Sequence, residues 1–162
     1  MENIVSALNE KFADQIISTE MLYDFPVITV KREKIVDVIQ YLHDHPETKF
    51  QFLTTLCAVH YPDQKEICLV YQLHNMHTNQ RVRLKTYLPE FRPVTPTITH
   101  IFTAANWLER ETFDFFGVNF IGHPNLKRIL NVEEMVIFPL RKEYPLEDQT
   151  REDKDNTMFG RV

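Results

Sequence analysis

The densest group of chemically capable side chains lies in residues 109–130, ERETFDFFGVNFIGHPNLKRIL. Its acids Glu109, Glu111 and Asp114 could serve as a general acid and base, because paired carboxylates can exchange protons with a substrate. Glu109 and Glu111, however, are separated by a single residue, and side chains at that spacing on a helix point in different directions. Asp114 is at position i+4 from Arg110, a pairing worth about 0.3 kcal/mol on an exposed helix. The spacing therefore argues against a catalytic dyad.

Histidines are numerous enough to suggest a metal site. His43 and His45 lie just before a proline at a predicted helix end, and His74 and His77 lie where a predicted strand enters a turn. A zinc site needs three or four converging ligands. Neither histidine pair is accompanied by carboxylates at a recognisable spacing, so we expect these histidines to lie in solvated loops.

The two cysteines, Cys57 and Cys68, lie in apolar, strand-like surroundings. Free cysteines tend to be buried, and we expect both to be buried and reduced. Neither has a second cysteine at CxxC spacing, which argues against an iron–sulfur cluster or zinc site held by this chain alone. No serine or cysteine nucleophile accompanies a histidine in a known catalytic motif. We therefore expect no catalytic, cofactor-binding or metal-binding residues.

Composition excludes further classes of site. Residues 1–116 contain no glycine, and both the dinucleotide fingerprint and the P-loop need glycines where the backbone approaches phosphate. The net charge of −5 gives no electrostatic reason to expect nucleic acid. No apolar run approaches the ~18 residues of a membrane span, and the N-terminus does not resemble a signal peptide. We expect a soluble, intracellular protein without direct membrane insertion.

Apolar residues at helical spacing predict two helices early in the chain, over residues 3–17 and 32–44. The apolar residues of the first are Ile4, Leu8, Phe12 and Ile16, and those of the second are Ile35, Val38, Ile39 and Leu42. Pro46 limits the second helix, because the residue before a proline disfavours the α region.

Strand signals surround and follow the second helix. Residues 22–31 predict a strand pair or a bent strand, and the apolar run at 50–61 predicts a central strand. EICLVYQLHNM and QRVRLKTYL alternate with period two and are joined through residues 77–80, which favours a hairpin. A proline-rich loop follows at 89–97. Hairpin-length connections favour an α+β fold over a parallel doubly wound sheet.

The predicted architecture is a two-layer α-β-β-α-β-β-β domain with a mainly antiparallel sheet, followed by a helix and an extended C-terminal tail. The last helix covers residues 104–116, with Thr103 as its N-cap and Gly117 as its left-handed stop. After residue 131 the apolar pattern weakens and charge increases. We therefore divide the chain into a compact domain, 1–130, and an extended, partner-wrapping tail, 131–162.

Recognition of another protein is the remaining explanation for the stretch at 109–130, because interfaces are enriched in Arg, Phe, Trp and Tyr. The tail segment LRKEYPL at 140–146 could lie along a partner in extended form. That contact would have to offset the entropy of ordering the segment.

The same stretch closely resembles the defining motif of the C subunit of NADH-quinone oxidoreductase, a peripheral-arm subunit family of respiratory complex I. That motif has Glu-Arg-Glu, a further acid and an apolar pair, followed by His or Lys, a basic residue and a second apolar pair. The matching residues are Glu109, Arg110, Glu111, Asp114, Phe115, Phe116, His123, Lys127, Ile129 and Leu130. FPLRKEYPL at 138–146 resembles the family's second motif, although EEMVIF at 133–138 departs from the family just before it. The resemblance spans roughly residues 20–148.

The resemblance implies a non-catalytic structural subunit that itself binds none of the cofactors. NADH, FMN, iron–sulfur clusters and quinone would belong to the assembled complex, which moves electrons to quinone and couples this to ion translocation. The implied partners are other complex I subunits, especially the D and B subunits, and the C-terminal extension would embrace the D subunit, which forms the quinone site. The implied location is the cytoplasmic face of the bacterial inner membrane, where partners would hold the chain.

On this reading the candidate site residues bind partners or hold the motif together. The basic ones, expected to pair with acidic interface groups, are Arg110, Lys127, Arg128, Arg141 and Lys142. The aromatic ones, expected to anchor apolar contacts, are Phe113, Phe115 and Tyr144. We expect the acids Glu109, Glu111 and Asp114 to hold the following basic turn, and His123 to lie in a turn with its neighbours. Two alternatives stay open: a stand-alone adaptor domain, and a metal-dependent enzyme that uses the histidines and acids.

Overall fold

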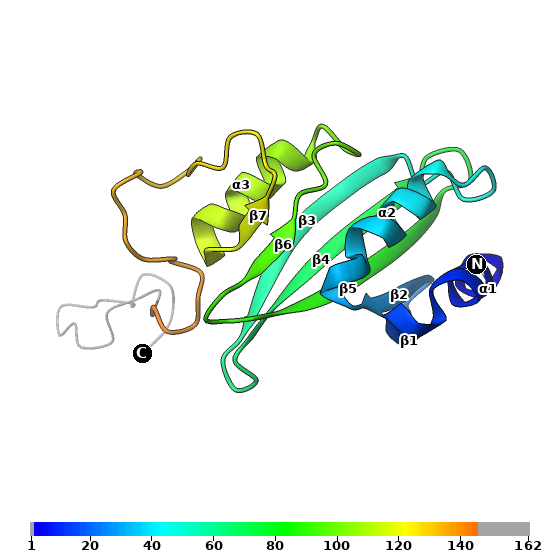
Figure 1. Ribbon diagram of the computed structural model, residues 1–162, viewed down its shortest axis with the longest axis horizontal. Coiled ribbons are helices and arrows are strands. Elements are labelled where there is room, and N and C mark those ends of the chain that lie inside the picture. The colour runs from blue at the N-terminus through cyan, green and yellow to red at the C-terminus, as the bar shows by residue number, and fades with distance from the viewer. Residues whose placement is uncertain (1, 146–162) are drawn as a thin grey trace, which may run out of the picture.

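A computed structural model describes residues 2–145, with side chains from residue 5 onward (Figure 1). The helices are α1 (Glu2–Phe12), α2 (Ile35–Asp44) and α3 (Ala105–Phe116), with short 3-10 turns at Ala13–Gln15 and Arg32–Lys34. The strands are β1 (Ile16–Leu22), β2 (Phe25–Val30), β3 (Phe52–Tyr61), β4 (Glu66–Asn75), β5 (Gln80–Pro89), β6 (Val94–Pro96) and β7 (Asn119–Ile121). The α+β class is confirmed. No helix among the described residues combines the length and the apolar character needed to cross a bilayer.

The main sheet has five strands in the order β1-β2-β5-β4-β3. The pairs β1–β2, β3–β4 and β4–β5 are antiparallel, whereas β2 and β5 are parallel. The predicted mainly antiparallel sheet is thus confirmed, with one parallel joint where a hairpin meets a three-stranded meander. The short strands β6 and β7 pair in parallel, so the end of the proline-rich loop lies beside the segment that follows α3.

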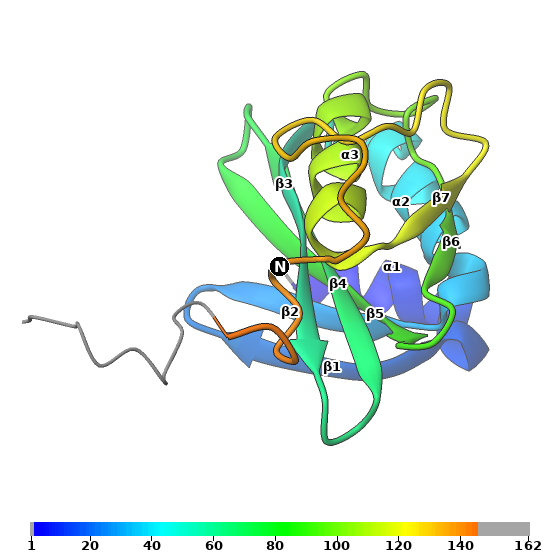
Figure 2. The ribbon, with the colours of Figure 1, turned by 90° about the vertical axis from the view of Figure 1, so that its left-hand side faces the viewer.

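One core fills the space between the sheet and its helices. The predicted α2 face is confirmed, because Ile35, Val38, Ile39 and Leu42 are fully buried. The inward side chains of β4 and β5, such as Tyr71 and Leu84, complete this core. Figures 1 and 2 show the described helices gathered on one side of the twisted sheet. Among residues 2–145, no helix covers the other side.

The first helix is shorter than its apolar spacing predicts. α1 ends at Phe12, and Ile16 begins β1 instead of continuing the helix. Ile16 pairs with Val30, and the β-branched run that starts at Ile16 suits a strand. Its apolar residues happened to fit the helical spacing, so sheet pairing decided the boundary.

The apolar strand at 50–61 lies at the edge of the sheet, not at its centre. Leu56 faces the core, but Val59 and Phe52 are 38% and 48% exposed. Cys57 is also exposed, contrary to expectation, whereas Cys68 is buried. Apolar residues on both faces usually mark a strand buried on both sides, and here no helix of residues 2–145 covers the second side.

Thr103 does not cap α3 as predicted. The N-cap position is Ala104, and no side chain caps this end. The first N–H groups of the helix instead donate to turn carbonyls, such as Asn106 N–H to Thr103 O at 3.2 Å and Trp107 N–H to Ala104 O at 3.2 Å. The preceding turn therefore satisfies donors that a capping hydroxyl would otherwise meet.

Gly117 ends α3 as predicted, with a φ of +75° and its N–H donating to Phe113 O at 2.8 Å. A Cβ built on Gly117 would lie 2.6 Å from Cε2 of Phe138. Gly122 also has a positive φ, +84°, but a Cβ there would meet only Cγ2 of Thr97, at 3.4 Å. The two glycines thus share backbone strain and differ in available space.

We expect Gly117→Ala to destabilise the chain more than Gly122→Ala. Both variants place a side chain at positive φ, at a cost of about 1–2 kcal/mol. Gly117→Ala adds about 1–3 kcal/mol of overpacking against Phe138. Urea denaturation of the two variants measures the difference. Equal losses would show that the Phe138 ring moves aside freely.

Candidate functional site

Asp114 is the buried centre of the segment where α3 ends and the chain turns back. Its side chain is fully buried. The N–H groups of Ile129, Leu130 and Asn131 donate to its Oδ2 at 3.1, 2.8 and 2.9 Å. Burial alone would raise the pKa of this carboxyl, but the donors from Asn131, Leu130 and Arg128 outweigh it and hold the pKa well below its usual range. Asp114 is therefore an ionised structural acid.

Arg128 supplies the counter-charge to Asp114. Its Nη1 donates to Oδ1 of Asp114 at 2.7 Å and to the Asp114 carbonyl at 2.8 Å. Its Nη2 donates to the carbonyls of Met135 and Ile137 at 2.6 and 3.0 Å, and the guanidinium lies over the Phe138 ring. One buried side chain thus fastens the helix end to residues 135–138.

Arg110 does not form the ion pair with Asp114 that the spacing suggested. Its Nε donates to the carbonyl of Lys127 at 3.1 Å and its Nη2 to the carbonyl of Arg128 at 3.0 Å. Asp114 faces the buried guanidinium of Arg128 instead. Together the two α3 side chains bind carbonyls at 127–128 and amides at 129–131. The Lys127 side chain itself is exposed.

Glu109 holds the segment at 97–98 against α3. It is fully buried. Its Oε1 accepts the N–H of Ile98 at 2.7 Å, and its Oε2 lies 2.5 Å from Oγ1 of Thr97. Burial raises the pKa of Glu109 to about 7, although the bonds from Ile98 and Thr97 partly oppose the rise. Glu111 is exposed, so the three acids do not converge and hold different segments or none.

His123 fixes the turn after β7. Its Nδ1 accepts the N–H of Asn125 at 3.0 Å, which leaves the proton on Nε2 for donation to the carbonyl of Asn106 at 3.1 Å. The histidine therefore ties the turn to the first turn of α3.

The second motif folds back on the first. Arg141 Nε donates to the carbonyl of Phe116 at 2.7 Å, and Leu140 N–H donates to the carbonyl of Phe115 at 3.2 Å. Phe138 packs edge-to-face on Phe113, with ring centroids 6.3 Å apart. These contacts satisfy carbonyls at the C-terminal end of α3 that the helix leaves free.

Two other candidate residues of this segment expose more of their surface. Tyr144 is half-buried and the side chain of Lys142 is exposed. The predicted tail begins at 131, and its residues 146–162 lie outside the described part of the chain. Its partner-wrapping role stays a prediction.

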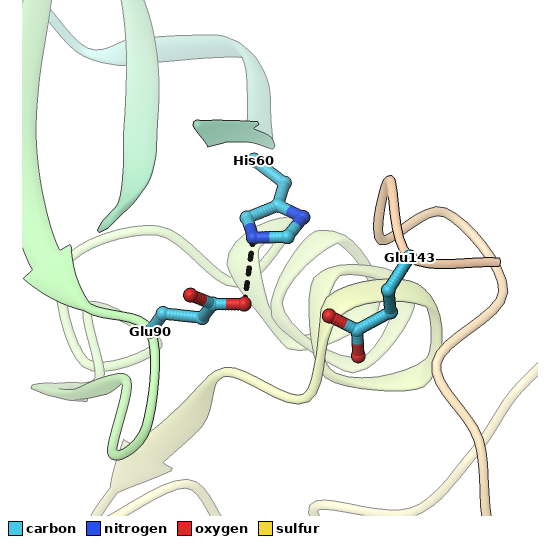
Figure 3. Close-up of side chains that lie close together, drawn as sticks. All are labelled: His60, Glu90 and Glu143. Atoms are coloured by element: carbon cyan, nitrogen blue, oxygen red, sulfur yellow. Dashed lines mark hydrogen bonds and ion pairs between the residues drawn. The ribbon is translucent and has the colours of Figure 1, made fainter. Parts of the chain in front are cut away.

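A histidine that the sequence did not single out holds the tail to the sheet. The His60 side chain, at the end of β3, is fully buried, and its ring faces Glu90 and Glu143 (Figure 3). Nδ1 of His60 accepts the N–H of Lys142 at 3.0 Å, and Nε2 lies 3.0 Å from Oε1 of Glu90. His60 and Lys142 are 82 positions apart, so no local pattern could have linked them.

This group of His60, Glu90 and Glu143 is the one three-residue arrangement in the described part of the chain with ligand atoms close enough for a metal, within 4.8 Å of one another. A metal-bound histidine normally donates a hydrogen bond from its other ring nitrogen. Here that nitrogen accepts the Lys142 N–H, so the proton resides on Nε2 and points at Glu90. The geometry is that of a hydrogen-bonded link, in which His60 joins Glu90 to the backbone of Lys142.

Comparison with known proteins gives a consistent family. Residues 28–150 match the family model described as the respiratory-chain NADH dehydrogenase 30 kDa subunit. The C subunit of the NADH-quinone oxidoreductase of Geobacter sulfurreducens is 37% identical over 91% of this chain and 91% of its own. The corresponding C subunit from Roseiflexus is 41% identical over 88% of this chain and 83% of its own.

Two solved structures share the fold. A chain of the membrane-bound sulfane sulfur reductase, an archaeal respiratory membrane complex, superimposes with a TM-score of 0.78 at 30% identity, covering 95% of this chain and 96% of that chain. A trypsin-resistant fragment of Nqo5 superimposes with a TM-score of 0.63 at 26% identity, covering 76% of this chain and 98% of the fragment.

We expect Asp114→Asn to lower the free energy of unfolding by about 3–5 kcal/mol, because removing one partner leaves Arg128 buried without a counter-charge. The amide nitrogen would also oppose the N–H groups that Asp114 now accepts. The matched control is Glu111→Gln, an exposed acid on the same helix, with an expected effect within about 0.5 kcal/mol. Urea denaturation at pH 7 compares them. A loss below about 1 kcal/mol for Asp114→Asn would contradict the role assigned to the pair.

The raised pKa of Glu109 leads to a separate prediction about how stability depends on pH. Its folded pKa of about 7 exceeds the ordinary 4.5, so the folded chain holds a proton that the unfolded chain has released across this window. The contribution of Glu109 to stability is complete below pH 4.5 and is lost as the pH rises to about 7. The wild type should lose about 3 kcal/mol there relative to Glu109→Gln, which mimics the protonated acid.

Urea denaturation at pH 5 and pH 8 measures this slope, with Glu111→Gln expected to parallel the wild type. Identical pH dependence in the wild type and in Glu109→Gln would show that Glu109 ionises normally in the folded chain.

Proposed function

The chain belongs to the family of the 30 kDa subunit of the respiratory-chain NADH dehydrogenase, and from this premise we propose that it is a non-catalytic structural subunit in the peripheral arm of a complex I. The observation that carries the proposal is that the buried acids of the family motif already have hydrogen-bond partners within the chain. Its buried polar groups, Asp114 and Glu109, are occupied by backbone donors of the same chain. Groups engaged in this way hold segments in place and leave little for a substrate.

The proposed docking partner is the quinone-site protein of the complex, the D subunit, with the B subunit as a further neighbour. An apolar ridge that begins at the last residue of the motif and continues to residue 140 supports docking. We call it the exposed ridge, and its members are Leu130, Val132, Val136, Ile137 and Leu140, between 37% and 90% exposed. Exposed apolar side chains that lie close together often mark interaction sites, whereas single scattered ones are normal on protein surfaces. The half-buried Tyr144 and the exposed Lys142 extend the same segment.

The proposal assigns the cofactors to other subunits. NADH, FMN, the iron–sulfur clusters and quinone would bind elsewhere in the complex, which would couple electron transfer to ion translocation. The chain would lie at the cytoplasmic face of the bacterial inner membrane, held by its partners. A similar chain in a sulfane sulfur reductase supports an assembly role that is shared by respiratory complexes reducing different substrates.

We expect the double variant Val132→Asp/Val136→Asp to enter the complex at no more than a tenth of the wild-type level. Both side chains are largely exposed, 65% and 90%, so the variant should fold normally, whereas a desolvated carboxylate in an apolar interface is costly. The matched control is Phe91→Asp, which changes an 89% exposed side chain off the ridge. A native gel with an in-gel quinone reductase assay measures incorporation.

Normal assembly of the ridge variant would contradict docking through this ridge. The non-catalytic role has its own test in Glu111→Gln, which should assemble and turn over normally. A Glu111→Gln complex that assembles fully but has lost turnover would contradict that role.

A further inference from the structure

The side of the main sheet opposite the helices forms a continuous surface that the core does not use. The strand register defines it, because paired residues on neighbouring strands project to the same face. Lys85 of β5 pairs with Val70 of β4, which pairs with Cys57 of β3. We call this surface the open face.

The described part of the chain places no helix over the open face. The apolar residues of α1, α2 and α3 join one cluster with the opposite side of the sheet, including Ile28, Tyr71 and Leu84. Figure 2 shows the three helices on that opposite side. Val59, Tyr61 and Tyr87 on the open face remain 36–38% exposed.

A row of positive charge crosses this surface. Arg81, Arg83 and Lys85 are alternate residues of β5 and therefore project from the open face about 6.6 Å apart. Arg83 is partly engaged, since its Nε donates to Oε1 of Gln72 at 2.9 Å and its guanidinium lies over the Phe25 ring. Arg81 and Lys85 have no side-chain hydrogen bond or ion pair to any described residue.

The acids of the open face lie at its margins. Glu20 is on the edge strand β1, across from Val27. Glu66 is the first residue of β4. Glu111 of α3 adds a negative charge near the β3 edge, since it raises the pKa of the Cys57 thiol while Arg83 lowers it. No carboxylate of the described residues forms an ion pair with Arg81, Arg83 or Lys85, so the row keeps its positive charge in a chain whose net charge is −5.

We propose that the open face docks an acidic segment of a partner subunit. Charge complementarity selects this occupant, since an extended segment with an acid at every second residue repeats at about 6.6 Å, the spacing of the basic row. The flanking Val59, Tyr61 and Tyr87 supply apolar contact beside the charges. A nucleic acid fits less well, because the net charge of −5 opposes it. The inference rests on the proposed function for the identity of the partner as another subunit.

The chain carries a native reporter of this surface. Cys57 is exposed on the open face, and Cys68, on the same face, is 1% exposed. Burial raises the pKa of Cys68 to about 11, so its thiol should react slowly in any state. Maleimide labelling of Cys57 in the isolated full-length chain and in the purified complex therefore measures coverage, with Cys68 as the internal control.

We expect Cys57 to label at least tenfold more slowly in the complex than in the isolated chain. We also expect Arg81→Glu/Lys85→Glu to be retained in the complex at no more than a tenth of the wild-type level at 0.15 M salt. Arg81→Lys/Lys85→Arg should be retained normally. The matched control, Lys49→Glu/Arg92→Glu, makes the same change in net charge in exposed loops off the row and should also be retained. Melting curves of the isolated variants confirm folding.

A photo-crosslinking amino acid at Val59 identifies the occupant. A crosslink to a carboxylate-rich peptide of another subunit supports the proposal. A crosslink to a peptide without acids, to residues 146–162, to a second copy of the chain or to nucleic acid overturns it, as does equal Cys57 labelling in both states. A wild-type chain that co-purifies with the complex while Cys57 labels freely would overturn this docking surface alone. A wild-type chain absent from the complex would overturn the proposed function itself.

Discussion

The arrangement after α3 depends on how the backbone polar groups of residues 127–131 are satisfied. These residues belong to no helix or strand, and a buried N–H or C=O without a partner costs about 1–3 kcal/mol. Arg110 donates to two of the carbonyls, and Asp114 accepts three of the amides. α3 thus supplies, from two side chains one turn apart, the partners that a neighbouring strand would otherwise provide. This explains why the motif needs a base and an acid at this spacing.

Arg128 likewise satisfies backbone carbonyls, in this case at the start of the tail. A buried ion pair contributes little net stability, because desolvation offsets the attraction. What the pair adds is direction, since the planar guanidinium binds Asp114 on one side and two carbonyls of the returning chain on the other. Lysine presents a single point charge and could not hold both at once. Phe138, beneath this guanidinium and against Gly117, makes the glycine stop and the arginine parts of one packing unit.

The spacing of apolar residues along the sequence predicted the elements whose burial repeats regularly. The buried face of α2 and the alternation of β4 and β5 follow from apolar spacing, and Gly117 follows from the chemistry of a left-handed cap. Contacts between residues far apart in the sequence could not be predicted. Asp114 pairs with Arg128 and not with Arg110, which is closer in sequence. His60 accepts a hydrogen bond from Lys142, 82 positions away. The edge position of β3 was missed for another reason. Apolar residues on both faces of a strand indicate burial on both sides, whether the covering layer belongs to the same chain or to a partner.

That ambiguity bears on how such a protein can dock. The buried polar groups of the motif are satisfied within the chain, so the turn at 127–131 is ordered before any partner arrives. Contact through the exposed ridge would then cost mainly side-chain freedom, which favours affinity for a given area. The open face differs in chemistry, because its charge row favours an acidic surface while the ridge favours an apolar one. If both proposed surfaces are used, their different preferences would let one small domain contact two neighbours in a defined orientation, as the proposed structural role requires.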